Sequence, residues 1–386
     1  MRTGWAAGRA AERTRSPRVD ALLFSDDTNS PGSPYWEEHG LRPNKRMGLG
    51  EAFLDSPASK RSRIDFEGYT SHFTFKDKAA HMHPVYSLAI SHDGSTLVSG
   101  SVDKTVKVWS LTDSCEPCCV QTLRGHSEYV SKVAVSSCGK SVFTGSFDRT
   151  ACRFSPNEGT QPVFRLSHAD PVRSFALDSS EDSWAFPHGD VYSTRMGEKQ
   201  SVIPGMESGK TVSFSMDDQF LAFDDPAHHE LKLTNIKGET ACTIGKHSEI
   251  SCMAWSPEGD LLLTSSLDNT VKIWQPWEGE DHHVATLNAH DDGVLSVAFS
   301  RDGTQLATGG KDERIHLYSV SQDTVQLERV LVGHTAAVTS LVFSPDGTRL
   351  FSAGFDHDIK MWGPFAHNDN HGVHRDWNLD SDIEDD

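Results

Sequence analysis

Long hydrophobic runs, a paired cysteine pattern and an excess of positive charge are all missing from this 386-residue chain. No apolar stretch approaches the roughly 20 residues that a membrane helix needs, so we expect no membrane span. The first residues also lack the apolar core of a secretory signal, which argues against secretion. These absences favour a protein that works in a reducing, aqueous compartment.

Cysteine is scarce and scattered. The chain has seven, an odd number without the spacing of a disulfide framework. Cys115, Cys118 and Cys119 lie close together, but a structural zinc site needs four ligands, usually in two spaced pairs. The pairs His228–His229 and His282–His283 lie in polar segments that are typical of exposed loops. The sequence therefore predicts reduced thiols, no metal site and no cofactor.

Basic residues are outnumbered, and the formal net charge is −19. The imbalance is concentrated in residues 71–366, which hold 24 basic and 38 acidic residues, a net charge of −14. Such a body repels phosphate backbones, so direct nucleic-acid binding is not expected. Protein or peptide partners remain open.

Internal repetition is the strongest positive signal. The stretch GHTAAVTSLVFSPDGTRLFSAGFDHDIKMW, residues 333–362, returns in varied form elsewhere in the chain. The histidines that anchor these units are His81, His126, His168, His247, His290 and His334. Successive histidines lie 42 to 45 residues apart, except for a gap of 79 residues after His168. That gap is about two periods long, which predicts a seventh unit without its histidine.

Each unit alternates short strands with tight turns. VTSLVFS alternates with period two, as a half-buried strand does, and SPDG supplies turn chemistry. RLFSAG and IKMW provide two more strands, and segments such as CVQTL or VATLN provide a fourth. Four strands per period of 40–45 residues is typical of propellers. We predict an all-β, seven-bladed β-propeller of four-stranded antiparallel blades at residues 70–366. Six blades with an irregular third and fourth unit is the alternative.

These units resemble the WD-repeat family of β-propellers, strongly in five units and weakly in the third and fourth. The resemblance implies that a segment near His72 to Lys76 closes the last blade, and that a histidine, a Ser or Thr, an Asp and a Trp form a buried tetrad. The implied sets are His81, Ser99, Asp103, Trp109; His126, Thr144, Asp148; His247, Thr264, Asp268, Trp274; His290, Thr308, Asp312; and His334, Ser352, Asp356, Trp362. Phe154 and Tyr318 stand in place of Trp in the second and sixth units. Phe has no N–H, so the second tetrad should be incomplete, whereas the Tyr hydroxyl can substitute in part.

The histidine, hydroxyl and aspartate of one unit also match the side chains of a hydrolase triad. The grouping recurs in five units, however, whereas an enzyme needs it once. A repeated brace for each blade explains the recurrence better, because buried polar groups need partners. We therefore expect no enzyme activity, with a site in the propeller channel as the alternative.

The resemblance implies a scaffold that docks proteins or peptides, as a monomeric ring within a larger complex. In such propellers the docking face collects the histidine-bearing loops and the turns that carry the aspartates. The residues that we predict there are Val102, Tyr129, Phe147, Leu267, Lys311 and Phe355. Exposed apolar side chains in turns favour a binding surface. The alternative is that they only pack over the rim of the channel.

The two ends have a different composition. Residues 1–69 are rich in Arg, Ser, Pro and Gly and are predicted to be a disordered arm, and residues 367–386 an acidic disordered tail. Candidate phosphorylation sites are Ser16, Ser30, Ser33, Ser56 and Ser381. Recognition through this arm is a second alternative function. The basic residues 60–63 and the Arg-rich first 18 residues are weak import signals. We expect a cytoplasmic or nuclear location, or both, with mitochondrial import as a lesser alternative.

Overall fold

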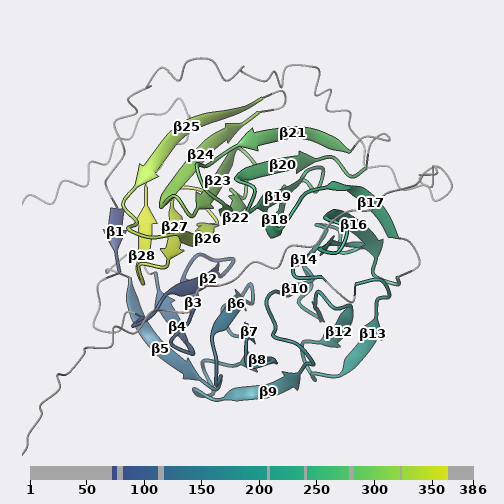
Figure 1. Ribbon diagram of the computed structural model, residues 1–386. Helices are drawn as coiled ribbons and strands as arrows, with labels where there is room; N and C mark the ends of the chain where they lie inside the picture. The colour runs from purple at the N-terminus through teal and green to yellow at the C-terminus, as the bar shows by residue number, and fades with distance from the viewer. Residues whose placement is uncertain are drawn as a thin grey trace, which may run out of the picture. The chain divides into compact units, whose positions relative to one another are not determined.

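The computed structural model describes residues 72–75, 81–111, 117–206, 209–238, 241–277, 282–321 and 324–363. These ranges form seven four-stranded antiparallel sheets that stand around a common axis as the blades of a β-propeller (Figure 1). The predicted all-β, seven-bladed fold is confirmed, and the six-bladed alternative is wrong. No helix in the described part of the chain is long and apolar enough to cross a membrane.

Each blade runs outward from an inner strand at the axis to an outer strand at the rim (Figure 1). The strands of blades 1 to 3 are β2 (Val85–Ile90), β3 (Thr96–Ser101), β4 (Thr105–Ser110), β5 (Cys118–Arg124); β6 (Val130–Val135), β7 (Val142–Ser146), β8 (Thr150–Phe154), β9 (Pro162–Ser167); and β10 (Ala176–Leu177), β11 (Ser183–Ala185), β12 (Asp190–Ser193), β13 (Lys199–Val202). The strands of blades 4 and 5 are β14 (Val212–Phe214), β15 (Phe220–Asp225), β16 (Glu230–Asn235), β17 (Ala241–Lys246); and β18 (Ile250–Trp255), β19 (Leu262–Ser266), β20 (Thr270–Trp274), β21 (His283–Asn288). The strands of blades 6 and 7 are β22 (Val294–Phe299), β23 (Gln305–Gly310), β24 (Arg314–Val320), β25 (Val325–Val332); and β26 (Val338–Phe343), β27 (Leu350–Gly354), β28 (Ile359–Trp362), β1 (His72–Thr74).

Blade 7 joins two distant parts of the chain. The predicted closing strand is present as β1, which pairs antiparallel with β28, and Figure 1 shows the purple and yellow arrows side by side. The backbone N–H of Phe75 continues this pairing by donating to the carbonyl of Ile359 at 2.9 Å. The Phe75 ring is buried, with centroids 5.3 Å from Trp109 of blade 1 and 6.3 Å from Phe351 of blade 7. One side chain thus connects the closing strand to both blades.

The hydrophobic core lies between neighbouring blades. Val98 and Val106 of blade 1, for example, pack in one cluster with Val130 and Val133 of blade 2. Close approach is possible because Gly100 has no side chain: a Cβ there would lie 2.7 Å from Cγ1 of both Val130 and Val133. A glycine at this place in the second strand therefore sets the distance between blades.

Polar contacts reinforce this packing near the axis. The second residue of the inner strand forms a β-bulge in blades 1, 2, 5, 6 and 7. In blades 2, 5 and 7 this residue carries a hydroxyl (Ser131, Ser251, Thr339), which donates to a backbone carbonyl of the next blade. The residue after the bulge is serine in blades 1, 6 and 7, and its hydroxyl accepts a backbone N–H from the next blade at 2.9–3.1 Å. These links fix the blades to one another around the axis.

Candidate functional site

The tetrads of blades 1 and 7 are continuous hydrogen-bonded chains. In blade 1, His81 contacts Asp103 through Nδ1 at 2.7 Å and Ser99 through Nε2 at 2.7 Å. Trp109 Nε1–H donates to the same serine oxygen at 2.9 Å. In blade 7 the corresponding distances are 2.7, 2.7 and 2.8 Å. Each of these tetrads links the turn before the third strand and the histidine loop to the second and third strands of its blade.

The tetrad of blade 5 is arranged differently. The ring of His247 contacts Thr264 through Nδ1 at 2.6 Å, while its Nε2 lies 3.0 Å from Thr270 and 3.5 Å from Asp268. Trp274 still donates to Thr264 at 2.8 Å. The hydroxyl of Thr270 therefore lies between His247 and Asp268, and it donates a hydrogen bond to Asp268 at 2.6 Å.

Blades 2 and 6 lack the indole N–H. In blade 2, Thr144 contacts His126 at 2.7 Å and donates to the carbonyl of Cys152 at 3.3 Å, so its oxygen receives no donor from Phe154. In blade 6, His290 contacts Asp312 and Thr308 at 2.8 Å each. The hydroxyl of Tyr318 instead contacts Nδ1 of His316, at 3.5 Å, so the hydrogen bond from an indole N–H to the Thr308 hydroxyl has no direct replacement.

The protonation states of the tetrads follow from burial and neighbours. Burial lowers the pKa of His81, and the nearby Lys107 lowers it further, against the effect of Asp103. Burial also lowers the pKa of His247 to about 4. In blade 2 burial is outweighed by the contacts of His126 with Asp148 and Cys152, which raise the pKa of His126 to about 9. Cys152 stands where blades 1 and 5 carry Lys107 and Lys272, so no cation opposes His126 there.

Access decides what these hydroxyls can do chemically. The five side-chain hydroxyls at the centres of the tetrads are fully buried, with 0% exposure (Ser99, Thr144, Thr264, Thr308 and Ser352). A hydroxyl that is buried from substrate cannot act as a nucleophile, so these groupings are unsuited to triad chemistry. They can, however, hold turns and strands in place.

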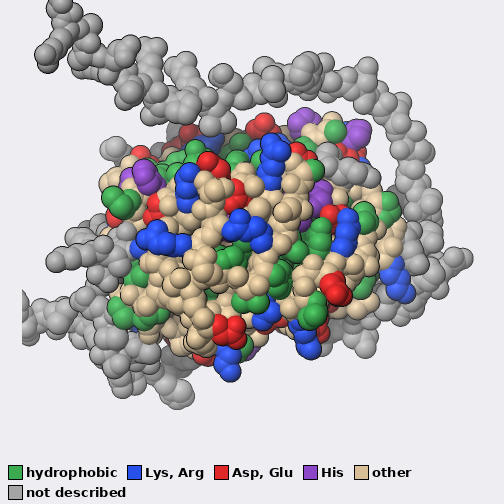
Figure 2. Space-filling view, turned by 90° about the horizontal axis from the view of Figure 1, so that it is seen from below, with side chains coloured by type: hydrophobic (Ala, Val, Ile, Leu, Met, Phe, Trp, Pro, Cys, Tyr) green, Lys and Arg blue, Asp and Glu red, His purple; other side chains and the backbone are tan. Residues whose placement is uncertain are grey.

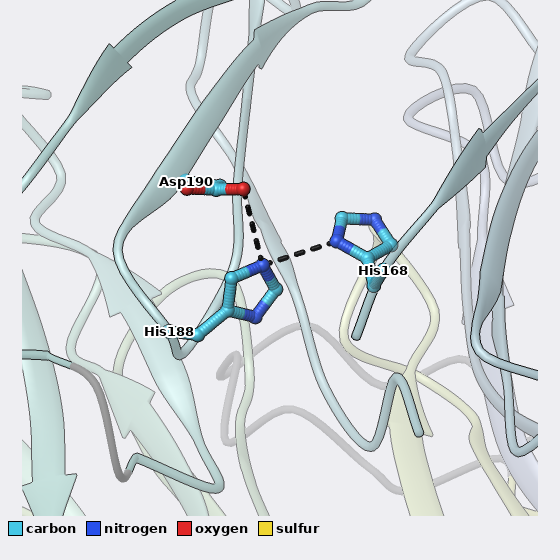
Figure 3. Close-up of side chains that lie close together, drawn as sticks. All are labelled: His168, His188 and Asp190. Atoms are coloured by element: carbon cyan, nitrogen blue, oxygen red, sulfur yellow. Dashed lines mark hydrogen bonds and ion pairs between the residues drawn. The ribbon is translucent and has the colours of Figure 1, made fainter. Parts of the chain in front are cut away.

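Blade 3 has a different polar cluster, which sequence reasoning missed. Trp184 pairs with Tyr192 just as Thr144 pairs with Cys152 in blade 2, so an indole occupies the Ser/Thr position. The following turn then brings His188 and Asp190 next to His168 (Figure 3). The signal was the sequence HGD, in which a histidine takes the place of the turn aspartate. Burial and the adjacent His188 lower the pKa of His168 to about 4.

Blade 4 uses another substitute. The carboxylate of Asp224, which is buried, accepts the backbone N–H groups of Lys210 and Thr211 at 2.7 and 2.6 Å. Burial raises the pKa of Asp224 against the effect of these bonds. A carboxylate and two backbone donors thus tie the loop to the second strand where the histidine is absent.

The residues predicted for the docking face occupy equivalent turns. In five blades the backbone N–H of the residue before the turn aspartate donates to the loop that follows the histidine, at 2.8–3.3 Å (Val102, Phe147, Leu267, Lys311 and Phe355). Tyr129 lies beside Phe147, with ring centroids 5.7 Å apart. Leu267 is 37% exposed and lies over Gly293 of the next blade, and Lys311 is exposed.

Two residues that sequence reasoning missed extend this surface. Tyr86, the bulged residue of β2, makes an edge-to-face contact with Phe355 at 5.5 Å between centroids. Arg173 of blade 3 lies over the Phe147 ring at 5.0 Å. Burial and the nearby Tyr129 raise the pKa of Tyr86, and the nearby Arg173 opposes this rise. Both Tyr129 and Arg173 therefore act on Tyr86 from other blades. We call the surface formed by these five residues (Tyr86, Tyr129, Phe147, Arg173 and Phe355) the aromatic face.

Several predicted residues lie outside the described part of the chain. They are Ser16, Ser30, Ser33, Ser56, Ser381, Cys115 and the basic residues 60–63. The proposed arm (1–69) and tail (367–386) belong to the same undescribed ranges.

Comparison with known proteins agrees with the blade pattern. Five segments match the family model described as WD domain, G-beta repeat, and together they make up half of the chain: residues 72–110, 117–155, 238–275, 282–319 and 325–363. The segments leave out blade 3 and most of blade 4, where the tetrads are lost.

Curated relatives match only part of their own length. Striatin-3 from Homo sapiens is 25% identical over 56% of this chain and 30% of its own, and RACK1y, a small ribosomal subunit protein of Oryza sativa subsp. japonica, is 26% identical over 47% and 44%. The ribosome biogenesis protein WDR12 homolog of Arabidopsis thaliana is 22% identical over 61% and 54%. The chain thus spans about a third to a half of the length of each of these three relatives. The repeated family match and the seven blades together show that this chain belongs to the WD40 repeat family.

Proposed function

We propose that the chain is a non-catalytic scaffold that docks protein or peptide partners on the aromatic face and so assembles a multiprotein complex. The observation that supports this most is the exposure of aromatic rings in the loops and turns of blades 2 and 7, the two neighbours of blade 1. Tyr129 and Phe355 are each 39% exposed, which leaves apolar ring surface for a partner to bury. Aromatic residues and arginine are the side chains that contribute most to protein interfaces.

The chemistry of the aromatic face indicates what it would accept. The rings offer a flat apolar surface, and Arg173 and the neighbouring Arg149 are both exposed. A partner that presents an apolar side chain beside a carboxylate would satisfy both parts. At the rim the surface is mixed: Figure 2 shows Lys, Arg, Asp and Glu side chains interspersed among uncharged ones. This contrast favours the aromatic face over the rim as the docking surface.

The tetrads serve this role indirectly in our proposal. They hold the turns that carry Phe147 and Phe355, because the aspartate after each of these residues is bonded to the histidine of the blade. Two relatives have names that connect them with multi-component assemblies, a ribosomal subunit protein and a ribosome biogenesis protein. Those names agree with a scaffold in the cytoplasm or nucleus. They do not identify partners for this chain.

The test is quantitative affinity purification from native extract with a matched pair of double variants. Tyr129→Glu with Phe355→Glu places two charges on the aromatic face. Val163→Glu with Val202→Glu places the same charges on the exposed outer strands β9 and β13, where the side chains are 49% and 56% exposed. Thermal unfolding first shows that both variants fold.

We expect the first variant to lose a defined set of partners that the second retains. Each anchoring ring contributes on the order of 2 kcal/mol at such interfaces, about 30-fold in affinity, so the loss should be nearly complete. Equal recovery by both variants would contradict docking on the aromatic face and would favour the N-terminal arm as the recognition element.

A further inference from the structure

Three metal-ligand side chains converge in blade 3. His168 follows β9, His188 lies in the turn between β11 and β12, and Asp190 begins β12. One ligand atom from each lies within 4.8 Å of the others. Figure 3 shows the Nε2 atom of His188 between Nδ1 of His168, at 3.0 Å, and Oδ2 of Asp190, at 3.6 Å.

These separations fit a small metal ion. Zinc binds imidazole nitrogen at about 2.0–2.1 Å and carboxylate oxygen at about 2.0–2.2 Å, so donors of a tetrahedral site lie about 3.3–3.5 Å apart. The two distances from His188 Nε2, 3.0 and 3.6 Å, differ from this by at most a few tenths of an ångström. The third pair, His168 and Asp190, lies within 4.8 Å, so a bound ion would draw these two donors closer together. We propose that His168, His188 and Asp190 bind a divalent transition-metal ion, with zinc as the preferred ion.

The donors are held in position by other contacts. Asp190 accepts a hydrogen bond from Tyr192 on Oδ2 at 3.1 Å, and Lys199 contacts its other oxygen at 2.7 Å. The His168 ring lies against Phe186, with centroids 4.3 Å apart, and its backbone N–H donates to Arg149 at 2.8 Å. Hydrogen-bonded carboxylates and fixed imidazoles are usual around metal ligands.

A purely structural brace explains the cluster less well. In blades 1, 6 and 7 both ring nitrogens of the tetrad histidine are hydrogen-bonded. The ring of His168 instead has one hydrogen-bond contact, from Nδ1 to another imidazole, and its Nε2 is buried without a hydrogen-bond partner. The cluster is also accessible: the side chains of His188 and Asp190 are 33% and 17% exposed. An ion could enter and keep a water as its fourth ligand.

Two other groups of histidines and acids suit a metal less well. In blade 6, His290 uses both nitrogens, and its ring is stacked on His316 at 4.2 Å with an interplanar angle of 17°, so the in-plane lone pairs do not converge. In blade 4, Lys232 contacts the carboxylates of both Asp225 and Glu230 beside His228. In blade 3 the lysine leaves one carboxylate oxygen to the ion.

The test is a titration of the full chain with Zn²⁺ by calorimetry, and with Co²⁺ by visible absorption. His188→Ala and Asp190→Asn remove one donor each, and both residues are exposed enough for the fold to tolerate the change. His228→Ala is the matched control, because its exposed histidine belongs to the rejected group in blade 4. Lys199→Met removes the cation next to the proposed ion.

We expect one Zn²⁺ per chain whose affinity falls at least about 100-fold in His188→Ala and Asp190→Asn, since loss of a ligand should exceed the effect of an outer-shell change. His228→Ala should leave it unchanged, and Lys199→Met should tighten it about tenfold by removing a repulsive charge. Absence of Zn²⁺ binding would overturn the proposal. Binding that His188→Ala and Asp190→Asn leave unchanged would overturn it too, by placing the ion elsewhere in the chain.

Discussion

Replacement of Phe75 by alanine should destabilise the whole ring. Its side chain is 2% exposed and lies in the cluster that joins blade 7 to blade 1. Truncation of a buried phenylalanine typically costs about 3–5 kcal/mol, because transfer energy is lost and a cavity remains. The cavity would lie between Trp109 and Phe351, which strand pairing holds in place, so collapse of the site should relieve little of this cost.

The assay is denaturant unfolding of the variant against the parent chain. The matched control is Phe355→Ala, which removes the same side chain from an exposed turn. We expect the control to lose about 1 kcal/mol, the typical value of one aromatic pair. If Phe75→Ala lost no more free energy of unfolding than Phe355→Ala, then β1 would not be stabilising the closed ring, and the reasoning would be refuted.

Two further predictions concern the tetrads. Ser99→Ala should cost about 2–4 kcal/mol, because it leaves buried nitrogens of both His81 and Trp109 without a partner, and a loss below about 1 kcal/mol in denaturant unfolding would contradict this. The histidines of blades 2 and 5 should titrate at opposite ends of the pH range, which proton NMR of the ring hydrogens measures directly. The pKa of His126 is raised to about 9, so its stabilising effect is full below about pH 6.5 and is lost as the pH rises through 9. The pKa of His247 is lowered to about 4, so its effect is present above about pH 6.5 and is lost as the pH falls through 4. Similar pKa values for the two rings would show that the Cys152 position does not control the charge of His126.

The sequence predicted the blade pattern because each unit repeats its turn chemistry. SPDG-like turns and alternating strands define four-stranded units even where the tetrad is lost, as in blade 4. The closing strand at His72–Thr74 was predictable for the same reason, since the outer strand has a fixed place before the next histidine.

Contacts between blades were less predictable, because they depend on bulges and loop positions that one sequence does not reveal. Tyr86, which contacts Phe355, is the bulged residue of β2, and the sequence does not mark the bulge. Arg173 reaches Phe147 from the loop of another blade, 26 residues away in the chain. The cluster of His168, His188 and Asp190 was missed because a turn histidine replaces the expected aspartate. The pairing register of β11 and β12 places this turn histidine, His188, next to His168, and that register cannot be read from the sequence.

The most direct test of the docking account is site-specific photocrosslinking in native extract. A photoreactive phenylalanine analogue at position 355 lies on the aromatic face, and the same group at position 202 lies on the exposed strand β13. The account predicts that discrete protein partners crosslink from position 355 and not from position 202. Equal crosslinking from both positions, or from position 202 alone, would contradict it.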